Sequence, residues 1–83
     1  MSYFVYLIGT GKNQKLITFV GYTKDINKRL NLHNSGKGAK FTRGRRWKVM
    51  YKEKHSTKSR ALAREYYIKK NRKLRNILKN IHK

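Results

Sequence analysis

The sequence contains no cysteine and no proline in its 83 residues. Without cysteine, neither a disulfide framework nor a thiolate metal site is available. A chain this short lies near the lower size limit for folding without such staples, so its stability must come from one small core. No repeat and no linker divides the chain. We therefore expect residues 1–83 to form a single domain.

Long hydrophobic runs are also absent. No apolar run approaches the roughly 18 residues that a membrane span requires, and Met1-Ser2-Tyr3 leads directly into a strand-like segment instead of a signal peptide. We expect an intracellular protein, cytoplasmic or nuclear, that is not secreted and does not bind a membrane.

Acidic residues are nearly absent: 3 Asp and Glu stand against 23 Lys and Arg, which gives a net charge of +20. Such an excess repels itself in a folded protein, and a phosphate backbone whose counterions are released on binding is its usual partner. The basic residues are spread along the chain and do not line one amphipathic helix, which favours nucleic acid over a membrane surface. Charge alone does not distinguish an enzyme from a binding module.

Two short runs of aromatic and branched residues open the chain. Residues 3–8 are followed by Gly9-Thr10-Gly11, and residues 16–20 are followed by Gly21. This pattern predicts an antiparallel hairpin whose strands end at these glycines. A third strand is predicted over residues 47–51, where apolar and polar side chains alternate.

Three helical patterns follow the hairpin. The first is expected to be capped by Thr23, with Asp25 in its first turn, and to end at Gly36 and Gly38. A basic, exposed loop then spans residues 35–46. The second helix is expected to be capped by Ser56 or Thr57, and its apolar stripe and that of the third comprise Ala61, Leu62, Ile68, Leu74, Ile77, Leu78 and Ile81.

These elements predict an α+β fold in the order β-β-α-β-α-α. A small three-stranded antiparallel sheet is expected to be flanked by helices that cover its apolar face.

Only Asp25, Glu53 and Glu65 can supply the carboxylate that a hydrolase using a divalent cation on phosphate requires. A helix N-terminus explains Asp25, and Glu53 lies among lysines at a strand end. Glu65 shares a helical face with apolar residues, where an unpaired carboxylate is costly. Either a nearby Lys or Arg pairs with Glu65, or Glu65 binds a metal ion.

Arg29 and His33 are four residues apart on the first predicted helix, so both project to one side. Arg29 can hold a phosphate oxygen, and His33 can donate or relay a proton. The plainer interpretation of this pair is a solvated helix face. Tyr6 is either a packing residue or a base, and the surrounding positive charge favours its phenolate.

The order of these motifs resembles the GIY-YIG endonuclease family, in its small stand-alone branch. The resemblance extends from Tyr3 to about Ile81 and includes the glycine-rich basic stretch 33–46. The motifs that carry it are Phe4-Val5-Tyr6, Phe19-Val20-Gly21, Arg29-x-x-x-His33 and Glu65.

The resemblance implies metal-dependent hydrolysis of DNA. In that scheme Glu65 binds Mg²⁺ or Mn²⁺, Arg29 contacts the scissile phosphate, and Tyr6, assisted by His33, activates water. We expect a monomer without a protein partner that reads DNA shape or little sequence. The strand backbone is expected to contact Lys37, Lys40, Arg43, Arg45, Arg46 and Lys69.

The sequence departs from the family pattern at two positions. Phe4 replaces a glycine of the first motif, and Phe19 replaces the tyrosine of the second. Tyr22 is expected to point to the opposite face of the strand from Phe19 unless the chain bends at Gly21. The second departure keeps open a catalytically inactive, basic nucleic-acid-binding module. An RNA-binding protein of the ribosomal type also explains the charge but not Glu65.

Overall fold

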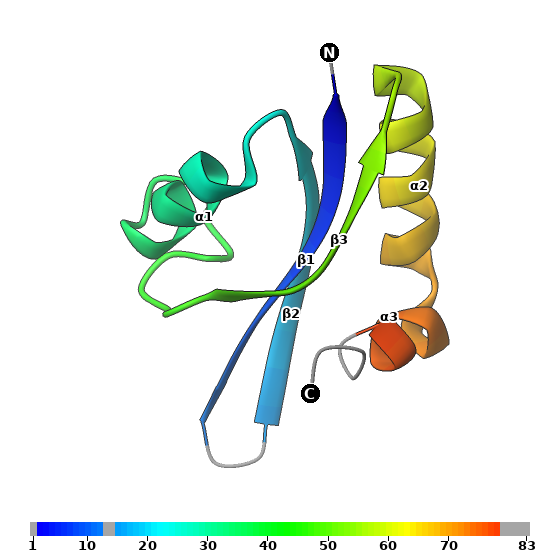
Figure 1. The fold of residues 1–83 in the computed structure, drawn as a ribbon. Helices are drawn as coiled ribbons and strands as arrows, with labels where there is room; N and C mark the ends of the chain where they lie inside the picture. Colours follow the sequence, from blue (N-terminus) through cyan, green and yellow to red (C-terminus); the bar gives the residue numbers. More distant parts are fainter. Residues whose placement is uncertain (1, 13–14, 79–83) are drawn as a thin grey trace.

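A computed structural model describes residues 2–12 and 15–78. The order β-β-α-β-α-α and the antiparallel three-stranded sheet confirm the predicted fold class (Figure 1). The elements are β1 Tyr3–Lys12, β2 Lys15–Thr23, α1 Ile26–Asn34, β3 Lys48–His55, α2 Lys58–Lys70 and α3 Arg72–Leu78.

The sheet has the strand order β2-β1-β3, so β2 is an edge strand. On the central strand, Tyr6 lies opposite Gly21 of β2 and Lys52 of β3. Both hairpin strands continue past the glycines at which the sequence predicted them to end. The hydrogen bonds between strands join only backbone groups, so a glycine can remain within a strand. A glycine there often marks a place where other atoms approach the backbone closely.

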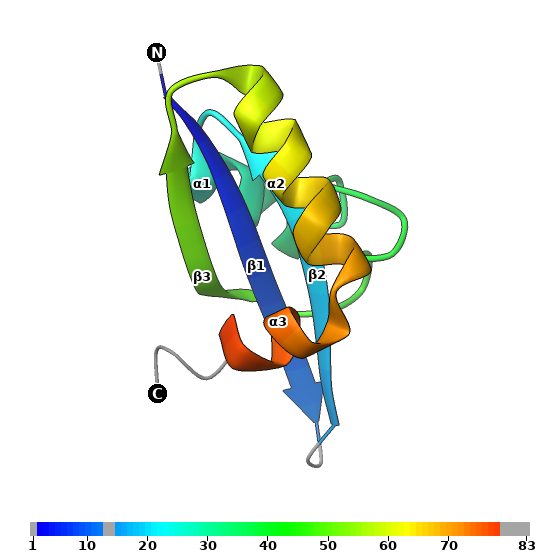
Figure 2. The ribbon, with the colours of Figure 1, turned by 90° about the vertical axis from the view of Figure 1, so that its right-hand side faces the viewer.

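Helices cover both faces of the sheet, not the single face that the sequence predicted (Figures 1 and 2). The reason lies in β1, where apolar side chains point alternately to both sides. One core, under α2 and α3, comprises Val5, Leu7, Val20, Ala61, Ile68 and Leu78. The other, under α1 and the loop that follows it, is built on Tyr6, Ile8 and Trp47.

The cap of α1 is Asp25, whose carboxylate accepts a hydrogen bond from the Lys28 N–H at 3.1 Å. The prediction that Thr23 caps this helix is wrong, because Thr23 still pairs with Phe4 in the sheet. A good N-cap stabilises a helix by about 1 kcal/mol. The cap of α2 is Thr57, one of the two residues predicted.

The apolar stripe of α2 is narrower than predicted. Ala61 and Ile68 are buried, whereas Leu62 is 38% exposed. Ala61 and Ile68 are seven residues, about two turns, apart and therefore share one face of α2. Leu62 is rotated by about 100° from Ala61 and so points away from that face. On α3, Leu78 is buried and Ile77 is exposed, and Ile81 lies outside the described residues. Within residues 2–12 and 15–78, no helix is long and apolar enough to cross a membrane.

Candidate active site

A hollow of about 150 Å³ opens beside the edge strand β2, between α1 and α2. Side chains from both faces of the sheet meet there because β2 is an edge strand, with no further strand of the described residues beside it. All four candidate catalytic side chains line the hollow. It is bordered by Tyr6, Phe19, Val20, Gly21, Tyr22, Arg29, His33, Gly38, Glu65 and Lys69.

Tyr6 and His33 form the buried wall of the hollow, at 3% and 1% exposure. The Tyr6 hydroxyl lies 2.8 Å from His33 Nε2. Two glycines make this contact possible. A Cβ atom at Gly21 would overlap the Tyr6 ring, and one at Gly38 would overlap the His33 imidazole.

A chain of hydrogen bonds fixes the tautomer of His33. The Thr42 hydroxyl donates to the Ala39 carbonyl at 3.0 Å, and it lies 2.8 Å from His33 Nδ1. Its proton is thus already used, so Thr42 Oγ1 accepts from Nδ1–H. In the neutral imidazole, Nε2 then has a free lone pair and accepts from the Tyr6 O–H. The order of donation is Tyr6 to His33 to Thr42.

The ionisation of this pair follows from its burial. Burial raises the pKa of Tyr6 to about 12, with a smaller opposing effect from Arg29 and a reinforcing one from Glu65. Burial, and then Arg29, lower the pKa of His33. Both groups are therefore neutral at pH 7. Positive charge acts on Tyr6 in the expected direction, since Arg29 lowers its pKa, but desolvation has the larger effect and the net shift is upward.

Glu65 reaches the hollow from α2, and its side chain is 17% exposed. The nearest cation is Lys69, whose Nζ lies 3.9 Å from Oε2. At that distance the two groups form an ion pair but not a hydrogen bond. The simpler interpretation of Glu65, a salt bridge with a nearby lysine, thus has a partner in the structure, but a loosely held one.

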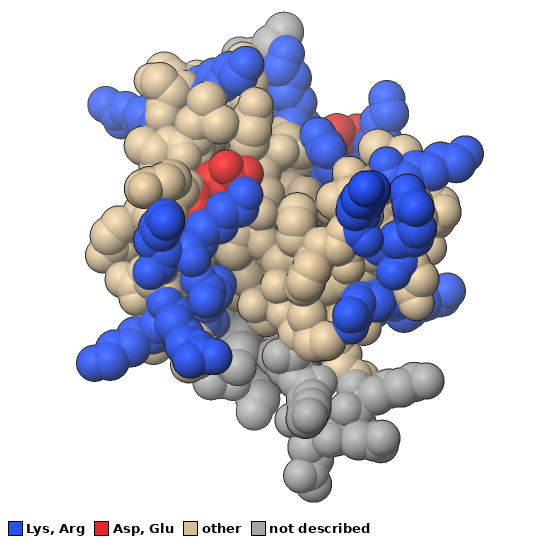
Figure 3. Space-filling model, turned by 180° about the vertical axis from the view of Figure 1, so that it is seen from behind, with Lys and Arg blue, Asp and Glu red and all other residues tan. Residues whose placement is uncertain are grey.

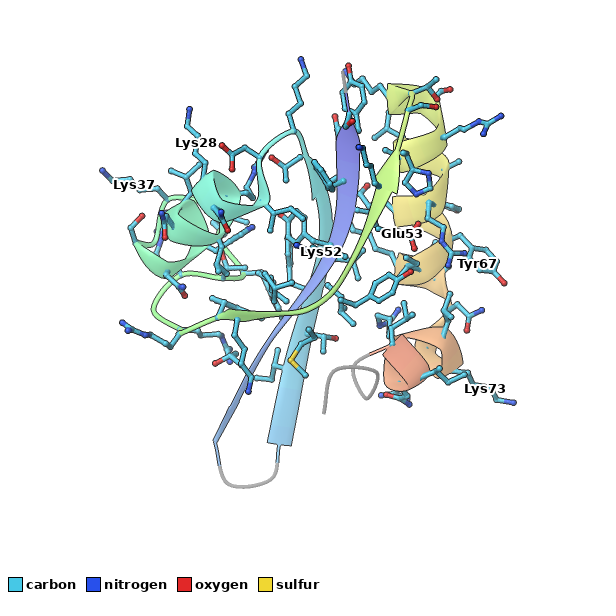
Figure 4. The ribbon with its side chains drawn as sticks, viewed as in Figure 1. Lys28, Lys37, Lys52, Glu53, Tyr67 and Lys73 are labelled. Atoms are coloured by element: carbon cyan, nitrogen blue, oxygen red, sulfur yellow. The ribbon has the colours of Figure 1, made fainter. Side chains whose placement is uncertain are left out.

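The other two acids have structural roles. Asp25 caps α1. Glu53 lies between β3 and α2 (Figure 4), where it accepts hydrogen bonds from Tyr51, His55 and Arg64. Burial opposes its ionisation, yet these hydrogen bonds hold its pKa below the usual range. Of the three carboxylates, only that of Glu65 borders this hollow.

A family model described as the GIY-YIG catalytic domain matches residues 2–77. The chain belongs to the GIY-YIG family. This confirms the resemblance inferred from the motifs, and GIY-YIG domains are nuclease domains.

Relatives of similar size share the GIY-YIG domain. UPF0213 proteins of Staphylococcus epidermidis and Staphylococcus aureus are each 45% identical over 69 residues, which is 82% of this chain and 80% of the relative. The solution NMR structure of a UPF0213 protein from Bacillus halodurans matches with a TM-score of 0.53 and 33% identity, covering 99% of this chain and 86% of that one.

Two aromatic residues at the second GIY-YIG motif border the hollow, Phe19 and Tyr22. The ring of Phe19, in the tyrosine position, lies edge-on to His33 with centroids 5.1 Å apart. Tyr22 packs against the core under α2, on the opposite face of β2 as predicted. It still reaches the rim of the hollow because β2 is an edge strand.

The cations of this GIY-YIG domain gather on both sides of the β2 edge, and a largely uncharged strip lies between them (Figure 3). Of the predicted DNA-contacting residues, only Lys69 lines the hollow. Arg45 and Arg46 line a separate hollow near Trp47 and the hairpin. The remaining three are exposed on the loop: Lys37, Lys40 and Arg43.

Sequence reasoning missed a second group of cations. A larger hollow of about 570 Å³ shares Tyr22 and Arg29 with the first. Three lysines line this larger hollow: Lys24 just before α1, Lys28 in α1 and Lys58 at the start of α2. The high density of positive charge was visible in the sequence. That the first turns of α1 and α2 border the same hollow was not. Thr42 was missed for a similar reason, since it lies nine positions after His33 in the sequence and meets it only after folding.

The donor set suits a magnesium-like ion. In the described part of the chain, no group of three or more His, Asp or Glu side chains could hold a metal by itself. Mg²⁺ usually keeps several waters and binds through one or two carboxylates together with substrate phosphates. A single, weakly paired carboxylate beside an arginine is compatible with that manner of binding.

Proposed function

We propose that this GIY-YIG protein is a metal-dependent DNA endonuclease that hydrolyses phosphodiester bonds, with selection by DNA shape or with little sequence preference. The observation that carries the proposal is the meeting of Tyr6, Arg29, His33 and Glu65 in one hollow. The four come from β1, α1 and α2 of a single chain. For that reason we propose that the enzyme acts as a monomer.

In the proposed mechanism, Glu65 holds Mg²⁺ or Mn²⁺, which when bound offsets charge on the scissile phosphate and the leaving oxygen. Arg29 contacts a non-bridging phosphate oxygen and stabilises charge that develops there. Lys69 contacts the backbone close to the same phosphate. The surrounding cations hold the strand without reading its bases.

The proton of the attacking water leaves through Tyr6 and His33. The Tyr6 oxygen accepts that proton while its own proton passes to His33 Nε2, so the tyrosine ends neutral and the imidazole ends protonated. The water oxygen forms a bond to phosphorus while the bond from phosphorus to the leaving oxygen breaks. The leaving oxygen keeps that electron pair and takes a proton from solvent. This relay needs no free phenolate, which suits a Tyr6 pKa raised to about 12.

Plasmid nicking tests the proposal. With Mg²⁺ or Mn²⁺ the wild type should nick supercoiled DNA, and EDTA should stop the reaction. Glu65→Ala should lose activity by at least about a hundredfold, within the range for removal of one transition-state contact. Asp25→Asn is the matched control, because asparagine also caps a helix, and it should remain active. Equal cutting by wild type and Glu65→Ala would refute the proposed site.

The second candidate is a basic nucleic-acid-binding module without catalysis. Phe19 favours it, since the position lacks the hydroxyl of the second motif while it borders the same hollow. This alternative predicts strong, salt-sensitive binding with no nicks in any of supercoiled, branched and single-stranded DNA. Nicking that depends on Glu65 would exclude it.

A further inference from the structure

The proposed mechanism leaves Phe41 without a role, although this side chain is 52% exposed beside the buried Thr42 and Trp47. It borders a groove of about 300 Å³. The groove shares Phe19, Val20 and Lys69 with the catalytic hollow and therefore continues it. Its other lining residues are Thr18 and Arg75.

Phe41 is held in position by other aromatic rings. Its ring is stacked on Phe19, with centroids 6.1 Å apart and planes 22° apart, and Trp47 lies 6.2 Å away. Trp47 Nε1 donates to the Thr42 carbonyl at 2.9 Å, which fixes the backbone next to Phe41. Phe19 in turn contacts His33. A row of rings thus leads from the proposed proton acceptor to the surface.

Cations accompany these rings. The Arg45 guanidinium lies 5.7 Å from the centroid of Phe41, and Lys69 Nζ lies 6.0 Å from that of Phe19. Arg75 donates to the Ile68 carbonyl at 3.0 Å, which holds its charge at the groove. Exposed rings among cations are the means by which proteins bind unpaired nucleotides, since the base stacks and the phosphate pairs.

A single exposed phenylalanine is common on protein surfaces and needs no function. Phe41 differs because it is stacked on a second ring, has the Arg45 guanidinium over its ring and borders a groove that leaves the proposed active site. A paired base in a duplex presents only its edges, because its faces stack on neighbouring base pairs. The groove therefore suits a nucleotide whose base is free to leave the stack.

We propose that Phe41, supported by Phe19, is a stacking site for one unpaired DNA base next to the scissile phosphate. The substrate is then DNA that is single-stranded or locally unpaired beside the cut. The position relative to the cut rests on the proposed nuclease function, whereas stacking itself is independent of cleavage.

Binding in EDTA tests the stacking site without any cleavage. The probes are an oligothymidine of about twelve nucleotides, within the site sizes of single-strand binders, and an abasic oligomer of equal length and charge. Phe41→Ala should bind the oligothymidine roughly tenfold more weakly, the usual effect of losing one stacked base. Its affinity for the abasic oligomer should not change. The salt dependence of oligothymidine binding should also be unchanged, because no phosphate contact is removed.

Two further variants complete the experiment. Phe41→Trp should bind the oligothymidine at least as tightly as the wild type. Its circular dichroism should match that of Phe41→Ala, which would show that the two variants differ in stacking and not in fold. Tyr66→Ala is the matched control, because Tyr66 is 64% exposed and has Lys70 over its ring but lies on α2 outside both hollows. It should bind both probes normally. Equal losses on both probes, or no loss in Phe41→Ala, would overturn the stacking site while leaving the nicking result intact.

Discussion

His33 is joined to its surroundings at both ring nitrogens, and this arrangement determines what the residue can do. Nδ1–H donates to Thr42, so Nε2 faces Tyr6 as an acceptor. A histidine free to rotate or to change tautomer would offer that lone pair only part of the time. Thr42 is therefore a positioning residue in the proposed mechanism, although it does not line the hollow.

Replacing Thr42 by valine should leave the Nδ1–H of His33 without an acceptor in a buried site. A lost buried partner costs about 1–3 kcal/mol of unfolding free energy, which chemical denaturation measures. Imidazole ¹⁵N shifts should report loss of the single Nδ1–H tautomer, a change that destabilisation alone does not produce. Thr42→Ser keeps the hydroxyl and should restore both the tautomer and cleavage. Failure of serine to restore them would contradict the role assigned to Thr42.

The lowered pKa of His33 has a consequence for stability. Because the folded protein disfavours the imidazolium, the unfolded chain takes up a proton first as pH falls below the ordinary value of 6.5. The contribution of His33 to stability is thus complete above that value and is lost as pH falls through the folded-state pKa. Denaturation from about pH 8 to pH 5 should show this loss, and His33→Asn should remove that part of it. An unchanged pH profile in His33→Asn would contradict the assignment.

At the scale of elements, the loop between α1 and β3 acts as part of the site and not only as a basic surface. The sequence predicted residues 35–46 to be exposed, and most of them are, but Thr42 is buried and Gly38 contacts the His33 ring. Trp47, which follows this loop, is also buried. The Asn34 amide also binds the Trp47 backbone at both its oxygen and its nitrogen. These contacts close the loop over α1.

Two glycines of this loop should respond differently to alanine. At Gly38, a Cβ atom would overlap His33, so Gly38→Ala should displace the imidazole and reduce nicking by at least about tenfold, which corresponds to 1.4 kcal/mol. At Gly44, φ is +77° and no atom lies nearby. Gly44→Ala should cost stability of about 1 kcal/mol and leave nicking normal. Similar nicking by both variants would contradict the loop's part in holding His33.

The order of the elements was predictable because alternation and helical spacing are local properties of the sequence. The role of each glycine was not, since a glycine that breaks a strand and one that admits a ring look the same in a sequence. Gly21 was predicted to end β2, yet it lies within the strand under the Tyr6 ring. Coverage of both sheet faces and the contact of Thr42 with His33 likewise depend on segments that meet only after folding.

Among the site residues, Glu65 could be singled out from the scarcity of acids, while Tyr6, Arg29 and His33 depended more on their order along the chain. Their meeting in one hollow needed the structure, because it depends on β2 being an edge strand. Their catalytic roles stay predictions. Phe41 gave no signal in the sequence, since its exposure and its stacking on Phe19 are tertiary properties.

At the scale of the whole molecule, the charge of +20 should dominate DNA affinity. The logarithm of the binding constant should fall linearly with the logarithm of salt concentration. Removal of one phosphate contact reduces that slope by about one unit. Lys69→Gln should therefore lower the slope, whereas Lys73→Gln on α3, which borders neither the proposed active site nor the groove at Phe41, should not.

Among the described residues, only Glu65 brings a carboxylate to the proposed catalytic hollow of this strongly cationic protein, so its removal should affect binding and cleavage in opposite directions. In EDTA the carboxylate repels phosphate, and Glu65→Gln should bind DNA severalfold more tightly than the wild type. With Mg²⁺ the same variant should bind DNA but not nick it, because an amide is a weaker ligand for a hard cation than a carboxylate. Titration of DNA with and without EDTA, alongside plasmid nicking, measures both effects. If Glu65 serves only as an ion-pair partner for Lys69, freeing that lysine should also tighten binding, but nicking should then persist.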